Sequence, residues 1–408
     1  MPLKKVKSVM SGRLEEFKEL GILKGEPIVT GLKKSTRKKG VRILVDGYGE
    51  REFIRMNSNS YLNLGLRQDL IEAEEETARE LGTGPGAGRS MSGTYKVHRD
   101  LEERLAAFHG KEACMIYSSA YAAVMGTLAA VVTQDSVVIS DELNHNCIIN
   151  GIHLSQPKDK KIYKHNDMDQ LHSRIKESVG ECQRLIIVTD GVFSMRGDYA
   201  RLREMADMAE KYDEDFEEGI LTIVDDSHGV GTLGDTGRGT MEVTGENRID
   251  ILIATLGKAL GVNGGYLVSD AVVVEFFKET APFYVYSNPI TPSEASAALK
   301  ALDVLDSEEG RKMLKSLRKM SDYFRAGLVD LGYEVIEGIH PIVPLMVRDT
   351  KKTRALVTHF KENGVFCAGV YYPIVPKGDE LIRLQVNIDH TKEDLDYVLS
   401  VIKKFQSD

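Results

Sequence analysis

Five short apolar runs separated by helical stretches constrain the fold of this 408-residue chain more than any other feature. Continuously apolar strands predict a mostly parallel sheet covered by helices on both faces, because strands of a one-sided antiparallel sheet alternate apolar and polar residues. Between the runs, the stretch 202–212 has its apolar residues at helical spacing. The sequence therefore predicts an α/β fold. The predicted strands are Ala113–Tyr117, Ser136–Ser140, Leu185–Thr189, Leu221–Val224 and Ile251–Ala254.

The pattern changes near residue 295 to longer helices, followed by a short strand at Ile342–Met346 and a closing helix after His390. Such a shift in the spacing of elements is typical of a domain boundary. We expect an N-terminal arm and extension over 1–60, a large domain over 61–292 and a smaller C-terminal α/β domain over 293–408.

The segment 113–134 contains no charged residue and imitates a membrane span. Its interior holds Ser118, Ser119 and Thr127, so a buried strand, a small-residue turn and a buried helix explain it better. We also expect no secretory signal, because the N-terminus mixes lysine with glutamate and lacks an apolar stretch. The sequence thus predicts a protein without a membrane segment.

The four cysteines are far apart and form no CxxC pair, which predicts a reducing, cytoplasmic location with neither a disulfide framework nor a metal site. A formal net charge of −9 argues against a general nucleic-acid binder. The basic run Lys33–Lys39 is expected to be a solvated loop, and the alternative is that it attracts an anionic substrate.

Polar side chains follow each of the five predicted strands. Because ligands of open α/β sheets bind beyond the carboxyl ends of the strands, we expect these residues to form one active site. The polar segments are Ser118-Ser119, Asp141 to His145, Asp190 to Ser194, Asp225 to His228 and Thr255 to Lys258.

The residue types at these strand ends indicate a specific chemistry. Lys258 lies in a glycine-rich turn, where its amine can be held in a pocket and form a Schiff base with an aldehyde. Either Asp225 or Asp226 can pair with a protonated pyridine nitrogen, since strand alternation lets only one of them face the ligand. Hydroxyls such as Ser119 and Thr255, near the free N–H groups of a helix start, suit a phosphate. The set points to pyridoxal 5'-phosphate (PLP).

Taken singly, each of these residues can also have a purely structural role. Lys258 can be a surface lysine, Asp225 a helix cap, and His145 a polar histidine of the core. A second pattern, Gly229–Gly234, matches the GxGxxG of dinucleotide-binding folds. Asp225–His228 intervene after the strand, however, and another glycine-rich stretch follows where that fold requires a helix. We therefore expect a loop here and no NAD site.

Six segments carry a family resemblance when they are taken together: Ser58–Leu62, Gly93–Glu102, Leu143–His145, Thr189–Met195, Val224–His228 and Thr255–Gly261. They resemble the α-oxoamine synthase family of fold-type I PLP-dependent enzymes, colinearly from residue 55 to residue 400. Within that family, Lys164–Met168 and Tyr371–Gly378 most resemble the glycine C-acetyltransferases, also named 2-amino-3-ketobutyrate CoA ligases. The resemblance implies a fold-type I transferase whose large domain binds PLP.

The resemblance also implies roles for individual residues. Lys258 would bond covalently to the cofactor and act as the general base, and Asp225 would pair with the pyridine nitrogen. His228 would bond the phenolic oxygen of the cofactor, and His145 would stack on its ring. The other cofactor-binding positions would be Ser119, Ala120, Tyr121, Ser194, Thr255 and, from a neighbouring subunit, Ser287. Asn59 and Arg383 would hold the carboxylate of the amino acid, to which the fork of an arginine is suited.

The implied reaction joins glycine or another small amino acid to an acyl-CoA, with acetyl-CoA expected first, in a homodimer with shared active sites. The alternatives are another α-oxoamine synthase, such as 8-amino-7-oxononanoate synthase, an aminotransferase of the same fold, and a PLP-binding protein without turnover. The chain departs from the family at Leu381, at Asn146-Cys147 and in the acidic stretch Asp213–Gly219. These departures leave the identity of the acyl group and the amino acid open.

Overall fold

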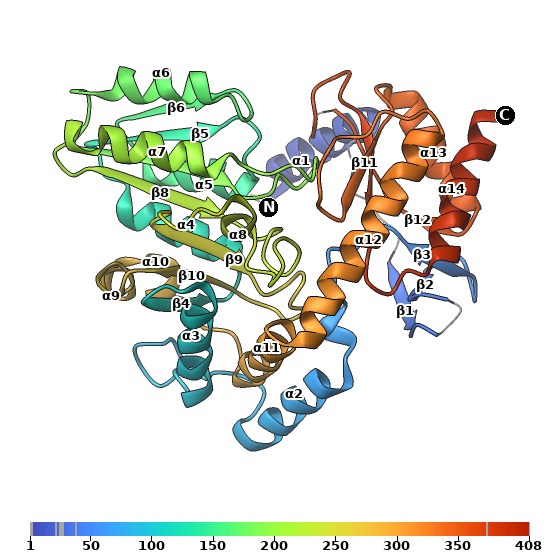
Figure 1. Cartoon of the computed structure of the whole chain (residues 1–408), viewed down its shortest axis with the longest axis horizontal. Coiled ribbons are helices and arrows are strands. Elements are labelled where there is room, and N and C mark those ends of the chain that lie inside the picture. Colours follow the sequence, from blue (N-terminus) through green and yellow to red (C-terminus); the bar gives the residue numbers. More distant parts are fainter. Residues whose placement is uncertain (1–2, 21–22, 24–27, 37–38, 373, 408) are drawn as a thin grey trace. The chain divides into compact units, whose positions relative to one another are not determined.

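The computed structural model describes residues 3–20, 23, 28–36, 39–372 and 374–407 (Figure 1). These residues form two compact units, which we call the large unit and the small unit. The large unit comprises Ser58–Pro344 and Leu384–His390, and the small unit comprises Met1–Asn57, Leu345–Arg383 and Thr391–Asp408. The small unit thus joins N-terminal and C-terminal segments, while the domain boundaries that we expect from the sequence remain a prediction.

A seven-stranded sheet, counted over the described residues, forms the centre of the large unit. Strands β9, β8, β7, β5 and β6 are parallel, whereas β10 pairs antiparallel with both β4 and β9. The five predicted strands and the mostly parallel sheet are confirmed, while β6 and β10 were not predicted. In spatial order, the strands are β4 (Ala113–Tyr117), β10 (Gly265–Ser269), β9 (Ile251–Thr255), β8 (Ile220–Asp225), β7 (Arg184–Asp190), β5 (Ser136–Asp141) and β6 (Asp159–Tyr163).

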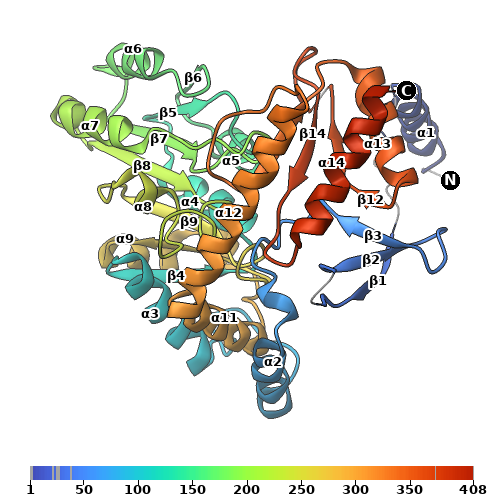
Figure 2. The same ribbon diagram turned by 45° about the vertical axis from the view of Figure 1, so that its right-hand side comes forward.

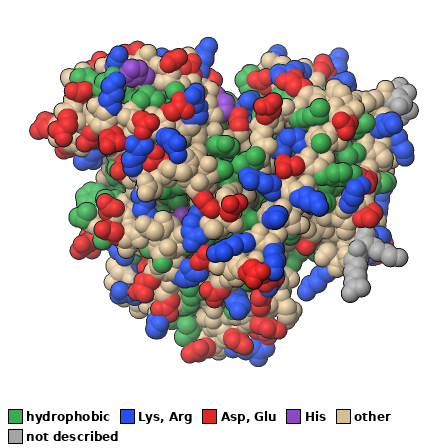
Figure 3. Space-filling view, viewed as in Figure 1, with side chains coloured by type: hydrophobic (Ala, Val, Ile, Leu, Met, Phe, Trp, Pro, Cys, Tyr) green, Lys and Arg blue, Asp and Glu red, His purple; other side chains and the backbone are tan. Residues whose placement is uncertain are grey.

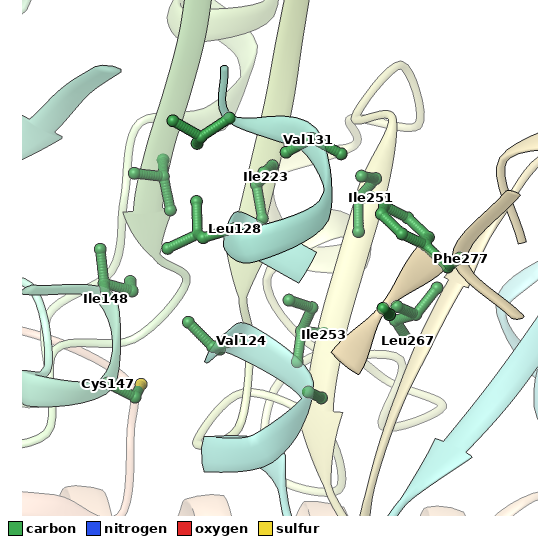
Figure 4. Packing of buried hydrophobic residues seen from close by; sticks show 14 of the residues in the cluster. Val124, Leu128, Val131, Cys147, Ile148, Ile223, Ile251, Ile253, Leu267 and Phe277 are labelled. Atoms are coloured by element: carbon green, nitrogen blue, oxygen red, sulfur yellow. The ribbon is translucent and has the colours of Figure 1, made fainter. Parts of the chain in front are cut away.

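Helices pack on the sheet. Figure 4 shows Val124 and Leu128 of α4 lying against Ile223 and Ile253 of the sheet. Burying one such leucine contributes about 1.5–3 kcal/mol. The predicted strand, turn and buried helix over 113–134 are confirmed as β4 and α4, and no helix among the described residues is long and apolar enough to cross a bilayer. Helices α6 and α7 lie along β5, β6 and β8 (Figure 2).

The helices of the large unit, with two short 3-10 turns, are η1 (Leu64–Leu66), α2 (Gln68–Leu81), α3 (Lys96–His109), α4 (Ala120–Val131), α5 (Asn146–Ser155), α6 (Met168–Ser178), α7 (Leu202–Tyr212), η2 (Asp213–Asp215), α8 (Thr240–Thr244), α9 (Ala271–Thr280), α10 (Pro282–Val285), α11 (Pro292–Leu305) and α12 (Glu308–Asp330). Helix α7 coincides with the predicted one. The glycine-rich stretch between β8 and α8 forms turns, so the predicted loop is confirmed.

The small unit contains a sheet in the order β1 (Val29–Lys33), β2 (Arg42–Val45), β3 (Glu52–Arg55) and β12 (Val365–Phe366). A second sheet has the order β11 (Ile342–Met346), β14 (Leu381–Gln385) and β13 (Ala368–Val370); β11 and β14 each contain residues of both units. The helices are α1 (Leu3–Glu19), α13 (Thr350–Glu362) and α14 (Lys392–Ser407), the last being the predicted closing helix.

The basic segment that begins at Lys33 is partly paired. Lys33 and Lys39 both lie within ion-pair distance of Glu52, at 3.1 Å and 3.3 Å, while Arg37 and Lys38 lie outside the described residues. On the face of the molecule in Figure 3, acidic and basic side chains are interspersed. The charge that could attract an anionic substrate is therefore reduced by Glu52.

Candidate active site

A cavity of about 240 Å³ lies at the carboxyl ends of β4, β5, β7, β8 and β9, where the polar segments were predicted to meet. Its lining includes every predicted cofactor residue of the large unit except Ser287. The lining residues are Ser119, Ala120, Tyr121, His145, Cys147, Asp190, Val192, Ser194, Asp225, Ser227, His228, Thr255 and Lys258. A larger cavity of about 800 Å³, bordered by the acidic stretch Asp213–Gly219, contains none of the predicted site residues.

The turn that presents Lys258 is held at both ends. The Thr255 hydroxyl at the end of β9 donates to the Gly264 carbonyl oxygen at 3.1 Å, which closes the loop between β9 and β10. Gly261 has a φ of +74°, and a Cβ there would lie 2.3 Å from the backbone nitrogen of Gly65. Only glycine permits this approach. The packed backbone of the turn therefore fixes the position of the Lys258 Cα, from which the side chain extends.

Strand alternation separates Asp225 and Asp226 as expected. The Asp225 carboxylate lines the cavity and accepts a hydrogen bond from the Ser227 backbone N–H at 3.1 Å. Asp226 is fully buried and accepts from the backbone N–H of Thr240 at 2.6 Å. Burial raises the pKa of Asp226 to about 7, against the hydrogen bonds from Thr240, which lower it. Asp225 is therefore the carboxylate that can meet a ligand.

His145 caps the start of α5, and its Nδ1 accepts from the Cys147 backbone N–H at 3.3 Å. The His145 backbone N–H donates to Asp190 Oδ2 at 2.9 Å. Burial lowers the pKa of the His145 imidazole, while Asp225 acts in the opposite direction and Lys258 adds to the lowering. A neutral ring held in this way can cover one face of an aromatic ligand.

Asp190 and Cys147 were not assigned a role from the sequence, although Asp190 stood among the polar strand ends. Asp190 is the direct neighbour of Asp225 across β7 and β8. Burial and the charge of Asp225 raise the pKa of Asp190 well above its usual range. The Cys147 thiol lies 3.5 Å from Asp225 Oδ2 and 2.9 Å from His145 Nδ1. The only local signal for Cys147 was its departure from the family pattern after His145.

The start of α4 supplies a site for an anion. Ser119 is its N-cap and accepts from the Ala122 N–H at 3.1 Å, while Ala120 and Tyr121 in the first turn line the cavity. The N–H groups and dipole of a helix start favour a phosphate. Gly265 makes this arrangement possible, because a Cβ there would lie 2.1 Å from the backbone nitrogen of Ala120. With the amine of Lys258 and the Asp225 carboxylate in the same cavity, these residues fit PLP.

His228 lines the same cavity and its Nδ1 lies 2.8 Å from the Tyr61 hydroxyl. The Tyr61 hydroxyl is also 3.3 Å from Asn59 Oδ1, which accepts from Gln385 Nε2 at 2.7 Å. The structure therefore connects Asn59, predicted to bind the substrate carboxylate, with His228, predicted to bind the cofactor.

Two predicted residues lie elsewhere. Ser287 is not part of the cavity lining, and its hydroxyl is 3.5 Å from the Asn288 carbonyl oxygen. Its predicted role in a neighbouring subunit remains a prediction. Arg383 belongs to the small unit, where it pairs across the sheet with Ala368, and its role with the substrate carboxylate also remains a prediction.

Comparison with known proteins decides the family. Residues 51–402 match the family model for aminotransferase class I and II. The 8-amino-7-oxononanoate synthase of Thermosipho melanesiensis is 36% identical over 95% of this chain and 96% of that protein. The corresponding synthase of Bacillus pumilus is 39% identical over 87% of this chain and 88% of that protein.

The chain belongs to the α-oxoamine synthases of the class I and II aminotransferase family. Among solved structures, serine palmitoyltransferase of Sphingomonas wittichii matches with a TM-score of 0.88 and 25% identity, covering 99% of this chain and 98% of that one. The predicted fold-type I architecture and the PLP cofactor are thus confirmed. The cavity described above is the candidate PLP site of this α-oxoamine synthase. The closer likeness to glycine C-acetyltransferases is not confirmed by these relatives.

Proposed function

We propose that this α-oxoamine synthase catalyses the 8-amino-7-oxononanoate synthase reaction, in which alanine is joined to a dicarboxylic acyl thioester. The observation that carries the proposal is the identity of 36–39% to synthases of that name along most of the chain. The product name describes an amine and a ketone on neighbouring carbons, a terminal methyl group and a distant carboxylate. Alanine supplies the methyl and the amine, the acyl chain supplies the rest, and the carboxylate of alanine leaves as carbon dioxide.

The cofactor, when bound, supplies an electron sink for the bond-breaking at the α-carbon of the amino acid. The start of α4 with Ser119 and Thr255 would hold its phosphate, and Asp225 would hold a proton at its ring nitrogen. His145 would pack against the ring, and Lys258 Nζ would take the α-proton of the amino acid as the general base. The thiol of the acyl carrier leaves when the new carbon–carbon bond has formed.

A panel of amino acids and acyl-CoA thioesters, scored by thiol release and by product mass, tests the proposal. We expect the largest thiol release with alanine and pimeloyl-CoA, accompanied by carbon dioxide. Lys258→Ala should lower the rate at least about a hundredfold, because general-base catalysis contributes that much or more. Lys176→Ala, which changes an exposed lysine of α6, should leave the rate unchanged.

A second candidate is glycine with acetyl-CoA. The resemblance of Lys164–Met168 and Tyr371–Gly378 to glycine C-acetyltransferases favours it, although Pro373 lies outside the described residues. Larger thiol release with glycine and acetyl-CoA than with alanine and pimeloyl-CoA would replace the first proposal with this one. Exchange of the amino group with a 2-oxo acid, without thiol release, would identify an aminotransferase instead.

A further inference from the structure

The Cys147 thiol forms part of the wall of the candidate PLP cavity, at a position where the chain departs from the family pattern. Cys147 lies in the first turn of α5, two residues after the N-cap His145, and is only 1% exposed. Its Sγ lies 2.9 Å from His145 Nδ1 and 3.5 Å from Asp225 Oδ2. One thiol thus contacts both residues that are predicted to meet the ring of the cofactor.

The thiol of Cys147 stays protonated in this environment. Burial and the negative charges of Asp225 and Asp190 raise the pKa of Cys147 far above its usual range. A thiolate would place a second negative charge 3.5 Å from the Asp225 carboxylate. A protonated thiol carries no charge, has one proton to donate and can accept weakly at sulfur. Cys147 is therefore a neutral hydrogen-bonding group between its two neighbours.

The two groups that the thiol contacts are also held by the backbone. Asp225 Oδ1 accepts from the Ser227 N–H at 3.1 Å, so Asp225 Oδ2 is the oxygen that meets Cys147. His145 Nδ1 accepts from the Cys147 N–H at 3.3 Å, and the His145 N–H donates to Asp190 Oδ2 at 2.9 Å. The outer torsion of an aspartate is broad, so one bonded oxygen defines the carboxylate plane loosely. The thiol contact at the second oxygen narrows the range of that torsion.

We propose that Cys147 is a positioning residue whose neutral thiol orients the Asp225 carboxylate and the His145 ring toward the cofactor. The inference rests on the PLP site and does not depend on which amino acid and acyl thioester react. A hydrogen bond is directional, so a carboxylate that rotates out of line holds a ring nitrogen proton less well. The thiol acts through Asp225 and His145, without needing to touch the cofactor itself.

Two substitutions at Cys147 separate hydrogen bonding from packing. Serine and alanine are both smaller than cysteine, but only serine keeps a proton donor at this position. The matched control is Cys114→Ala, because Cys114 is also buried and lies in β4, outside the cavity lining. Burial raises the pKa of Cys114 as well, so both alanine variants remove a neutral, buried thiol. An effect that arises only from a lost buried sulfur would therefore appear in both.

The first measurement is the dissociation constant of PLP, together with the visible absorption of the bound cofactor. Cys147→Ala should weaken PLP binding about two- to tenfold, the effect of losing one neutral hydrogen bond, and shift the absorption band. Cys147→Ser should restore both quantities toward those of the wild type. Cys114→Ala should leave both unchanged.

The second measurement is the S–H stretching band in the infrared difference spectrum between the wild type and Cys147→Ser, both without PLP. The other three cysteines are common to the two proteins, so the difference isolates the Cys147 thiol. Hydrogen bonding weakens the S–H bond, and we expect a band at lower frequency than that of a free thiol. This result stands even if Cys147→Ala fails to fold.

Wild-type PLP affinity and absorption in Cys147→Ala would overturn the inference, as would equal changes in Cys147→Ser and Cys147→Ala. An equal change in Cys114→Ala or an S–H band at the frequency of a free thiol would do the same. Because these measurements need no substrate, failure of alanine or pimeloyl-CoA as substrates would refute the proposed function alone.

Discussion

Replacing His165 with glutamine is predicted to remove a pH-dependent part of the stability of the large unit. His165 Nδ1 lies 3.3 Å from Asp141 Oδ1, and its Nε2 lies 3.0 Å from Asp198 Oδ2. Its ring also meets Phe193 edge-on, with centroids 4.3 Å apart. A protonated His165 thus ties the end of β5 to the loop that carries Ser194 into the cavity.

The magnitude follows from the pKa of His165. Burial by itself lowers this pKa, but the hydrogen bonds and charges of Asp141 and Asp198 outweigh burial and raise it to about 9. Relative to an ordinary histidine pKa of about 6.5, the difference corresponds to about 3 kcal/mol of stability. Because the pKa is higher in the folded chain, this stabilisation is fully present below about pH 6.5 and is lost as the pH rises through about 9.

Urea unfolding of the wild type and His165→Gln over that pH range measures the effect. The difference in the free energy of unfolding between the two proteins should be largest near pH 6 and shrink by about 3 kcal/mol by pH 10. His153→Gln, at an exposed position on α5, is the control and should follow the wild type throughout. A difference between wild type and His165→Gln that is constant with pH would refute the charged pairing.

Two further substitutions are predicted to destabilise the chain, each for a different reason. Gly265→Ala would force a Cβ against the start of α4. It should lower the free energy of unfolding, measured by urea titration, by about 1–3 kcal/mol and weaken PLP binding. The control Gly84→Ala, which has open space around its Cβ, should change neither quantity. In the small unit, Asp394→Ala would leave the nearly buried Arg42 guanidinium without its carboxylate partner. This should lower the free energy of unfolding by about 3–5 kcal/mol, again measured with urea. Wild-type stability of Gly265→Ala or Asp394→Ala would contradict the corresponding argument.

The strands that could be predicted are those whose signal is local. The run 185–188 is apolar throughout because both faces of β7 are buried, and no knowledge of its neighbours is needed to recognise it. Strand β6 lacks that signal, whereas β10 is buried along its whole length and apolar over 266–268. Strand β6 is at the sheet edge and carries three charged residues, while Gly265–Ser269 follows a glycine-rich turn and pairs with β4, far away in the sequence. Partners so distant leave no pattern within a window of a few residues.

The candidate site likewise has some features that the sequence predicts and others that require the tertiary structure. The sequence by itself determined that hydroxyl, carboxylate, imidazole and amine groups would gather at one edge of the sheet, because parallel strands end on the same side. It also determined that only one of Asp225 and Asp226 could face a ligand, because strand residues alternate.

Only the tertiary structure decided which groups touch. The register of β7 and β8 places Asp190 beside Asp225, and burial together with the charge of Asp225 raises the pKa of Asp190. The contact between Tyr61 and His228 joins residues 167 positions apart in the sequence. Residue type and local periodicity decide which elements form and which chemical groups they carry. Hydrogen-bond partners depend on distances of about 3 Å between atoms of remote segments, and only tertiary packing decides these distances.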